Sequence, residues 1–194
     1  SVPNTEEWVA ELWNEVIALY ENEDIPVAVS DILVYTSTDP FANSPNTALI
    51  LDTFMLHINN ITYDGRLAHL LSTRNVGGGR AYVDVLCSNS AQVAVSTSLS
   101  TNIVPLPTFS WSVECVTHEM GHNMGSRHTH ACVWNGNNTA IDGCGPAAGY
   151  NEGCNGPLPD EGTIMSYCHL VSGVGINFNL GFGPQPGDLI RSRY

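Results

Sequence analysis

Residues 118–128 read HEMGHNMGSRH, and they constrain the interpretation of this 194-residue chain more than any other segment. If the segment is helical, His118 and His122 lie one turn apart and project from the same face. Gly125 suits the left-handed backbone conformation that ends a helix, so the chain can reverse and return His128 to the same place. Three neutral imidazoles fit Zn²⁺ and leave one coordination position for water.

Glu119 follows the first of these histidines directly. In that position its carboxylate can take a proton from a zinc-activated water and later pass it to a leaving amine. A structural zinc is normally closed by a fourth protein ligand, whereas an open position is typical of a catalytic zinc. A histidine-rich helix end satisfied by solvent is the other interpretation, and the regular spacing with glycine at the turn disfavours it.

The same stretch resembles the signature H-E-x-x-H-x-x-G-x-x-H of the metzincin metallopeptidases. The segment GTIMSYC at 162–168 resembles the Met-turn that follows this signature. The resemblance implies an α/β (α+β) fold with a mixed twisted sheet, an active-site helix and a smaller, loop-rich C-terminal lobe. It also implies that Met165 forms an apolar floor beneath the zinc histidines without binding the metal.

Within the metzincins, the order of predicted elements and the Asn-Met-Gly variant at 123–125 are most similar to the adamalysin/reprolysin (ADAM-type) branch. Three features depart from it. Thr129 stands where adamalysins usually have aspartate, and is more like the pappalysins. The first β-strand of the family has no counterpart here, so the domain could begin upstream of Ser1.

The third departure is Tyr167, which completes a Met-x-Tyr sequence like that of astacins and serralysins. In those families the tyrosine can bind zinc and swing away to stabilise the oxyanion, a catalytic role that the resemblance would give Tyr167. A buried, hydrogen-bonded tyrosine is the structural alternative. For His130 and His169 the sequence leaves a role beside the site and a purely structural role open.

We expect one metallopeptidase domain over 1–194, with an upper subdomain of about 1–128 and a lower subdomain of about 129–194 that carries the Met-turn. Apolar periodicity and turn residues locate the secondary structure. The predicted helices are 5–22, 45–59, 109–124 and a short one at 188–193, and the predicted strands are 27–35, 67–72, 81–87 and 93–97.

The predicted edge strand 81–87 is the expected binding place for an extended protein or peptide substrate. A peptide can add itself to a sheet edge through backbone hydrogen bonds. The candidate contact residues are Ala81, Tyr82, Val83 and Asp84. We expect the protein to act as a monomer.

The charge balance excludes whole classes of partner. The chain has no lysine, six arginines and 19 acidic residues, for a formal net charge of −13. Such a surface cannot neutralise a run of phosphates or an anionic bilayer, so neither nucleic acid nor a membrane is an expected partner. The chain opens with Ser-Val-Pro and no visible signal peptide, as expected of a processed product or an excised domain.

Six cysteines are present, and none forms a Cys-x-x-Cys pair. An even number at wide spacing favours disulfides and a secreted, extracellular protein, against six reduced thiols in a cytosolic one. Six cysteines allow 15 pairings, and sequence alone cannot choose among them. The pairing we expect from their positions is Cys144–Cys154, Cys132–Cys168 and Cys87–Cys115.

These features together predict a secreted zinc endopeptidase with Glu119 as general base. A pappalysin-like or astacin-like peptidase would change the family label more than the chemistry. A zinc-bearing binding domain that has lost catalysis is the rival of another class. The intact Glu119 argues against it, because such a domain has no need of that base.

Overall fold

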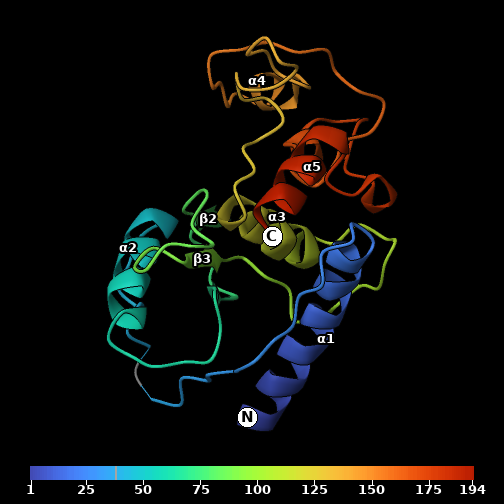
Figure 1. Ribbon diagram of the computed structural model, residues 1–194. Helices are drawn as coiled ribbons and strands as arrows, with labels where there is room; N and C mark the ends of the chain where they lie inside the picture. The colour runs from blue at the N-terminus through green and yellow to red at the C-terminus, as the bar shows by residue number, and fades with distance from the viewer. Residues whose placement is uncertain (38) are drawn as a thin grey trace.

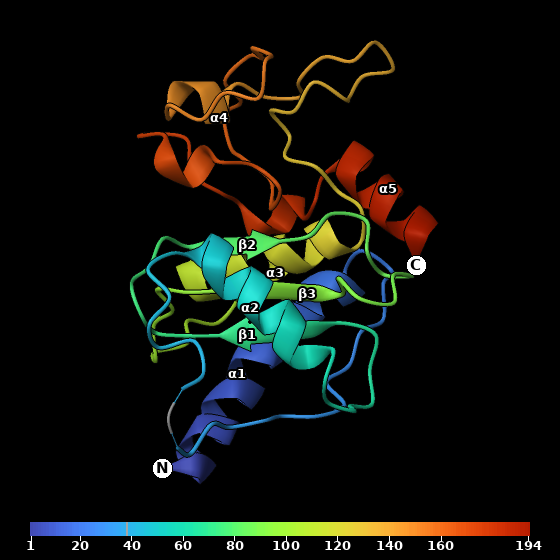
Figure 2. The same ribbon diagram turned by 90° about the vertical axis from the view of Figure 1, so that its left-hand side faces the viewer.

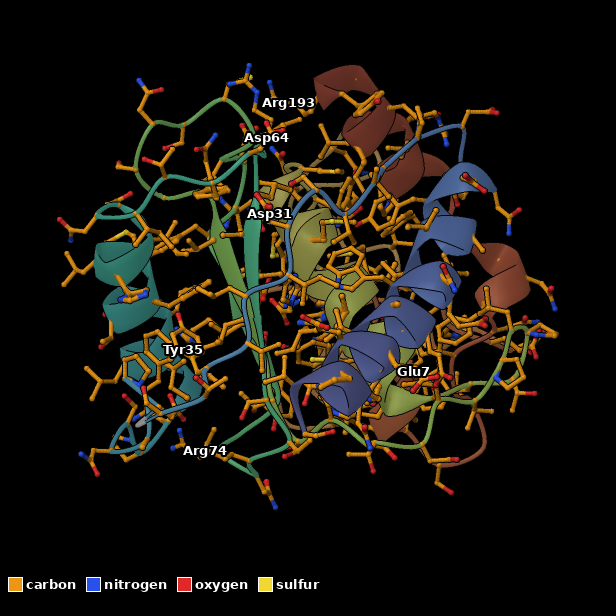
Figure 3. The ribbon with its side chains drawn as sticks, turned by 90° about the horizontal axis from the view of Figure 1, so that it is seen from below. Glu7, Asp31, Tyr35, Asp64, Arg74 and Arg193 are labelled. Atoms are coloured by element: carbon orange, nitrogen blue, oxygen red, sulfur yellow. A yellow bond between two sulfur atoms is a disulfide. The ribbon has the colours of Figure 1, made fainter. Side chains whose placement is uncertain are left out.

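A computed structural model describes residues 1–37 and 39–194, and within them the protein forms three layers. A small sheet lies in the middle, with helix α2 against one face and helices α3 and α1 on the other (Figures 2 and 3). The described elements are α1 (Val2–Glu21), α2 (Thr47–Ile58), β1 (Ala68–Leu71), β2 (Gly79–Ala81), β3 (Val93–Ser96), α3 (Trp111–Asn123), α4 (Cys144–Ala147), the 3₁₀ turns η1 (Cys168–Leu170) and η2 (Phe178–Leu180), and α5 (Pro184–Arg193).

The sheet is mixed, with strand order β1-β3-β2. Strand β1 pairs with β3 in parallel, with Ala68 opposite Val93, and β2 pairs with β3 antiparallel, with Gly79 opposite Ser96. All of β3 is buried because helices cover both faces of the sheet. The predicted α/β fold with a mixed sheet is therefore confirmed, as are the strands predicted at 67–72 and 93–97 to within a residue or two.

Two predicted strands were wrong. Residues 27–35 are all described and form no strand. The segment is apolar enough for a strand, but Leu33 is exposed. One of its contacts is a hydrogen bond from the backbone amide of Asp64 to the carboxylate of Asp31, at 3.0 Å. Both residues are labelled in Figure 3. Of the strand predicted at 81–87, only Ala81 lies in a strand, as the last residue of β2.

The chain leaves the sheet after β2 because the end of α3 captures its backbone. The amide of Asp84 donates to the carbonyl of His122 (2.9 Å), and that of Val85 donates to the carbonyl of Asn123 (2.8 Å). Asp84 also has a left-handed φ of 60°. These bonds attach the loop after β2 to the end of α3.

The helices begin at other residues than the sequence predicted. Helix α1 starts at Val2 instead of residue 5, and α5 starts at Pro184 instead of residue 188. Helix α2 is capped by Asn46, whose side chain accepts from the amide of Leu49, so Pro45 lies before the cap and not in the first turn. Proline in the first turn of α1 and α5 costs no hydrogen bond, since those amides have no helical partner.

Helix α3 lies at the centre of the molecule (Figure 1). Its residues are buried from Ser112 to Asn123, because the sheet, α1 and the C-terminal segment surround it. The loop-rich segment with α4 lies beyond α3 on the side away from α1 and the sheet (Figures 1 and 2). Among residues 1–37 and 39–194, no helix has the length and apolar character needed to cross a membrane.

The disulfides are Cys132–Cys154 and Cys144–Cys168, so all three predicted pairs were wrong. The bonded cysteines have Cα atoms 5.4 and 4.9 Å apart, which suits a disulfide. Among the described residues Cys87 and Cys115 are free, the first exposed and the second buried in α3. Both bonds hold the C-terminal loops together around α4, and the pairing follows the path of those loops.

Candidate metal centre

Helix α3 and the turn that follows it bring three histidine rings together. His118 and His122 have ring centroids 4.8 Å apart. The helix ends at Asn123, and Gly125 adopts a φ of 103°, as the sequence predicted. The reversal places the His128 ring 5.2 Å from that of His118 and 4.6 Å from that of His122.

Hydrogen bonds select the tautomer of each ring. Nδ1 of His118 lies 2.7 Å from the carbonyl oxygen of Ile164, and Nδ1 of His122 lies 2.7 Å from that of Ser126. A carbonyl oxygen can only accept, so each Nδ1 carries the hydrogen and each Nε2 keeps a free lone pair. Nδ1 of His128 donates in the same way to the carboxylate Oε1 of Glu152, at 2.6 Å.

The free nitrogens fit a zinc ion. Nε2 of His122 and Nε2 of His128 are 3.1 Å apart, and one ligand atom from each of the three histidines lies within 4.8 Å of the others. Bonds of about 2.0–2.1 Å in tetrahedral geometry separate neighbouring donors by about 3.3 Å. The three side chains that the sequence assigned to zinc are therefore brought together, and His118, His122 and His128 would hold it.

Glu119 lies beside this group, with 7% of the residue exposed. Its Oε2 has no hydrogen-bond partner in the described part of the chain. Burial raises the pKa of this carboxyl to about 7, although the nearby His118 and Arg80 act to lower it. A pKa near neutrality suits a group that accepts a proton and then returns it. Strand β2 touches the same carboxylate, because a Cβ on Gly79 would collide with Oε1.

Met165 is completely buried against α3, and its role as a floor beneath the histidines stays a prediction. A Cβ on Gly121 would lie 2.8 Å from its Sδ, so a glycine in the helix lets the sulfur approach. The carbonyl of Met165 accepts from the amide of Thr129 (3.0 Å), which ties the Met-turn to the segment that carries His128. The preceding carbonyl, of Ile164, is the acceptor that orients His118.

Two aromatic rings cover the third histidine. The ring of Tyr167 lies 4.6 Å from that of His128, and burial raises its pKa far above the usual range. The buried ring of His130 stacks on His128 at 4.8 Å with an interplanar angle of 7°. Its Nε2 lies 3.6 Å from Oε1 of Glu152. Sequence reasoning missed Glu152, which lies in a loop 24 residues from His128 and belongs to no motif.

The predicted substrate strand reaches the site only at its beginning. Ala81 pairs with Ala94 at the end of β2. The carbonyl of Tyr82 accepts from the side chain of Asn123, and the hydroxyl of Tyr82 donates to Asp52. The amide of Asp84 donates to a carbonyl of α3. Residues 82–84 therefore run along the end of α3 and form no free strand edge. A role for Ala81 in substrate binding stays a prediction.

A cavity of about 290 Å³ lies along α3 and is bordered by His118, but not by His122 or His128. Glu114, which sequence reasoning did not single out, lies one turn before His118 and is 1% exposed. Neither of its carboxylate oxygens has a hydrogen-bond partner among the residues that the structure describes, and burial raises its pKa to about 7. The cavity is lined by Gly77, Gly78, Gly79, Trp111, Glu114, Cys115, His118, Glu119, Tyr150, Tyr167, His169 and Leu170.

This combination of a central helix, a histidine triad and a methionine beneath it is that of the metzincin peptidases. Residues 1–171 match the model of Metallo-peptidase family M12, of the reprolysin type, and the chain belongs to that family. The expected resemblance to the reprolysin branch is thereby confirmed. Members of this family are zinc metalloproteases.

One curated relative is a zinc metalloproteinase-disintegrin-like protein, kaouthiagin-like, of Naja atra. It is 26% identical over 132 residues, which cover 64% of this chain and 21% of the relative. The matched region thus makes up about a fifth of the relative's length.

Proposed function

We propose that this protein is a secreted zinc endopeptidase in which Glu119 is the general base. The observation that carries the proposal is the Oε2 of Glu119, which has no hydrogen-bond partner among residues 1–37 and 39–194 and is buried beside three imidazoles whose free Nε2 atoms converge. Hydrogen bonds orient all three rings, so little rearrangement is needed to bind the metal. We take residues 1–194 as one catalytic domain, divided near residue 128 and active as a monomer.

Zinc, when bound, supplies a Lewis acid that activates water and polarises a peptide carbonyl. Glu119 takes the proton of the attacking water and returns it to the amine that leaves. In the metal-free site, burial raises the pKa of this carboxyl to about 7, so Glu119 is a stronger base than an exposed glutamate. Tyr167 lies over His128, where its hydroxyl would donate to the negative oxygen that develops on the carbonyl.

The substrate is a peptide or a segment of a protein. We place it along the edge of β2, because this strand is at the end of the sheet order and Gly79 touches the Glu119 carboxylate. The available backbone edge is then Gly79–Ala81, shorter than the sequence indicated. Secretion is supported by the two disulfides and by the similarity to the Naja atra metalloproteinase-disintegrin-like protein.

The test compares three zinc-loaded proteins: the wild type, Glu119→Ala and the control Glu7→Gln. Glu7 is exposed on α1 (Figure 3), so its substitution changes the charge without touching the site. Hydrolysis of internally quenched peptides and zinc content are measured together. We expect Glu119→Ala to keep one zinc and to lose activity by a factor of about 10²–10⁴.

The wild type must also lose activity on removal of zinc with a chelator. Full activity of Glu119→Ala would refute the general-base role. A wild type that binds zinc tightly and cleaves no peptide would instead support the rival function, a zinc-bearing binding domain.

A further inference from the structure

The carboxyl group of Glu114 is buried in α3 and has no hydrogen-bond partner among the described residues. Its two oxygens have no hydrogen-bond donor in the described residues, although burying an unpaired carboxylate is costly. The nearest basic group is Nδ1 of His118, 3.8 Å from Oε1, and the hydrogen on that nitrogen is directed to the carbonyl of Ile164. The site already described does not use Glu114.

The cavity beside Glu114 is large enough for a side chain, with a volume of about 290 Å³. It runs from Glu119 and Tyr167, where the reaction takes place, past Glu114 to Trp111 and His169. Glu114 precedes His118 by four residues, which corresponds to about 6 Å along the helix. A residue held at the metal centre must therefore have a long side chain to reach the Glu114 carboxylate.

The walls favour a cation over a neutral or negative group. The indole of Trp111 and the ring of His169 lie 5.5 Å apart at the far end, and aromatic faces attract ammonium and guanidinium groups. Burial lowers the pKa of His169 to about 4, so this ring adds no positive charge near neutral pH. Of the described residues that line the cavity, none is an arginine, and the chain contains no lysine.

We propose that this cavity is a specificity pocket for an arginine or lysine side chain adjacent to the scissile peptide bond, with Glu114 as its counter-charge. The inference rests on the proposed peptidase function and names its substrate class: peptides and proteins with a basic residue next to the cleaved bond. The net charge of −13 supports it, because an acidic enzyme attracts cationic substrates. Glu114 then gains the charge-assisted hydrogen bonds that the described residues do not supply.

A pair of peptides isolates the charge. Cleavage of a mixed peptide pool first identifies the substrate position with the strongest selection. At that position one peptide then has arginine and the other has citrulline, the neutral isostere of arginine. The ratio of kcat/KM for the two is measured with zinc-loaded wild type, Glu114→Gln and the matched control Glu7→Gln. We expect a preference for arginine of about tenfold or more in wild type and control, because hydrogen bonds to charged groups are the stronger ones. In Glu114→Gln the ratio should fall to about two or less.

Glu114→Asp covers the case in which the glutamine variant fails to fold. This variant keeps the charge and should keep a preference for arginine. Its kcat/KM for neutral peptides with long side chains should not rise. The inactive Glu119→Gln, loaded with zinc, gives a second readout by calorimetry. It should bind the arginine peptide more tightly than the citrulline peptide.

Each result bears on one proposal. If wild type cleaves both peptides equally, or if Glu114→Gln retains the preference for arginine, the pocket is wrong and the peptidase stands. If wild type cleaves neither but Glu119→Gln binds arginine selectively, the peptidase is wrong and the cation pocket stands.

Discussion

Removing the carboxylate that orients the third histidine should weaken zinc binding without unfolding the protein. Glu152 accepts from Nδ1 of His128 at 2.6 Å, and this bond leaves Nε2 of that ring free for the metal. In Glu152→Gln the shape is kept and the negative charge is lost. The amide can present either its oxygen or its NH₂ group, so the His128 ring is less strongly held.

The size of the effect follows from the exposure of the two side chains. A hydrogen bond to a charged group contributes about 1.5–3 kcal/mol. The Glu152 side chain is 38% exposed and that of His128 17%, so solvent screening lowers the value to about 1–2 kcal/mol. This corresponds to a zinc Kd that is about 5–30 times larger. Loss of a carboxylate partner of a metal-binding histidine typically costs a similar factor.

Competition with a chromogenic chelator at fixed pH measures the zinc Kd directly. Glu161→Gln is the matched control, because it makes the same change in the same lobe, where the carboxylate accepts from Asn177 and not from a histidine. The Kd of the control should stay within a factor of about two of the wild type. If Glu152→Gln leaves the Kd equally unchanged, the carboxylate does not orient His128.

The remaining predictions concern packing and pH. Met165→Ala should lower the free energy of unfolding, measured by urea denaturation, by about 2–5 kcal/mol. Met165→Leu should lower it by less than about 1.5 kcal/mol. Equal losses in the two variants would argue against an apolar floor. Burial lowers the pKa of His69 to about 3, so the folded state resists protonation of this ring and stability falls as pH drops below about 6.5. Between pH 7 and pH 5, the unfolding free energy of metal-free wild type should fall by about 1–2 kcal/mol more than that of metal-free His69→Gln. Parallel curves of unfolding free energy against pH for the two proteins would contradict this.

Much of the candidate metal centre was predictable from the sequence because its geometry is local. His118 and His122 share a helix face by periodicity, and the left-handed Gly125 is encoded within the same short segment. The burial of Met165 against α3 agrees with its order after the histidine motif, whereas its role as a floor is still a prediction. Helix and strand positions in the core were also predictable from apolar periodicity, whereas the segment 27–35 showed that a β-rich composition forms no strand without a neighbouring strand to pair with.

The sequence by itself determined the three imidazoles, the adjacent carboxylate and an acidic surface, since these depend on residue identity and on spacings of a few residues. Only the tertiary structure decided which cysteines pair, where β2 ends and which carboxylates face the rings. Glu152 reaches His128 from a loop 24 residues away, and the carbonyl that orients His118 comes from 46 residues away. Such contacts depend on the path of the whole chain, which no local pattern of residues specifies.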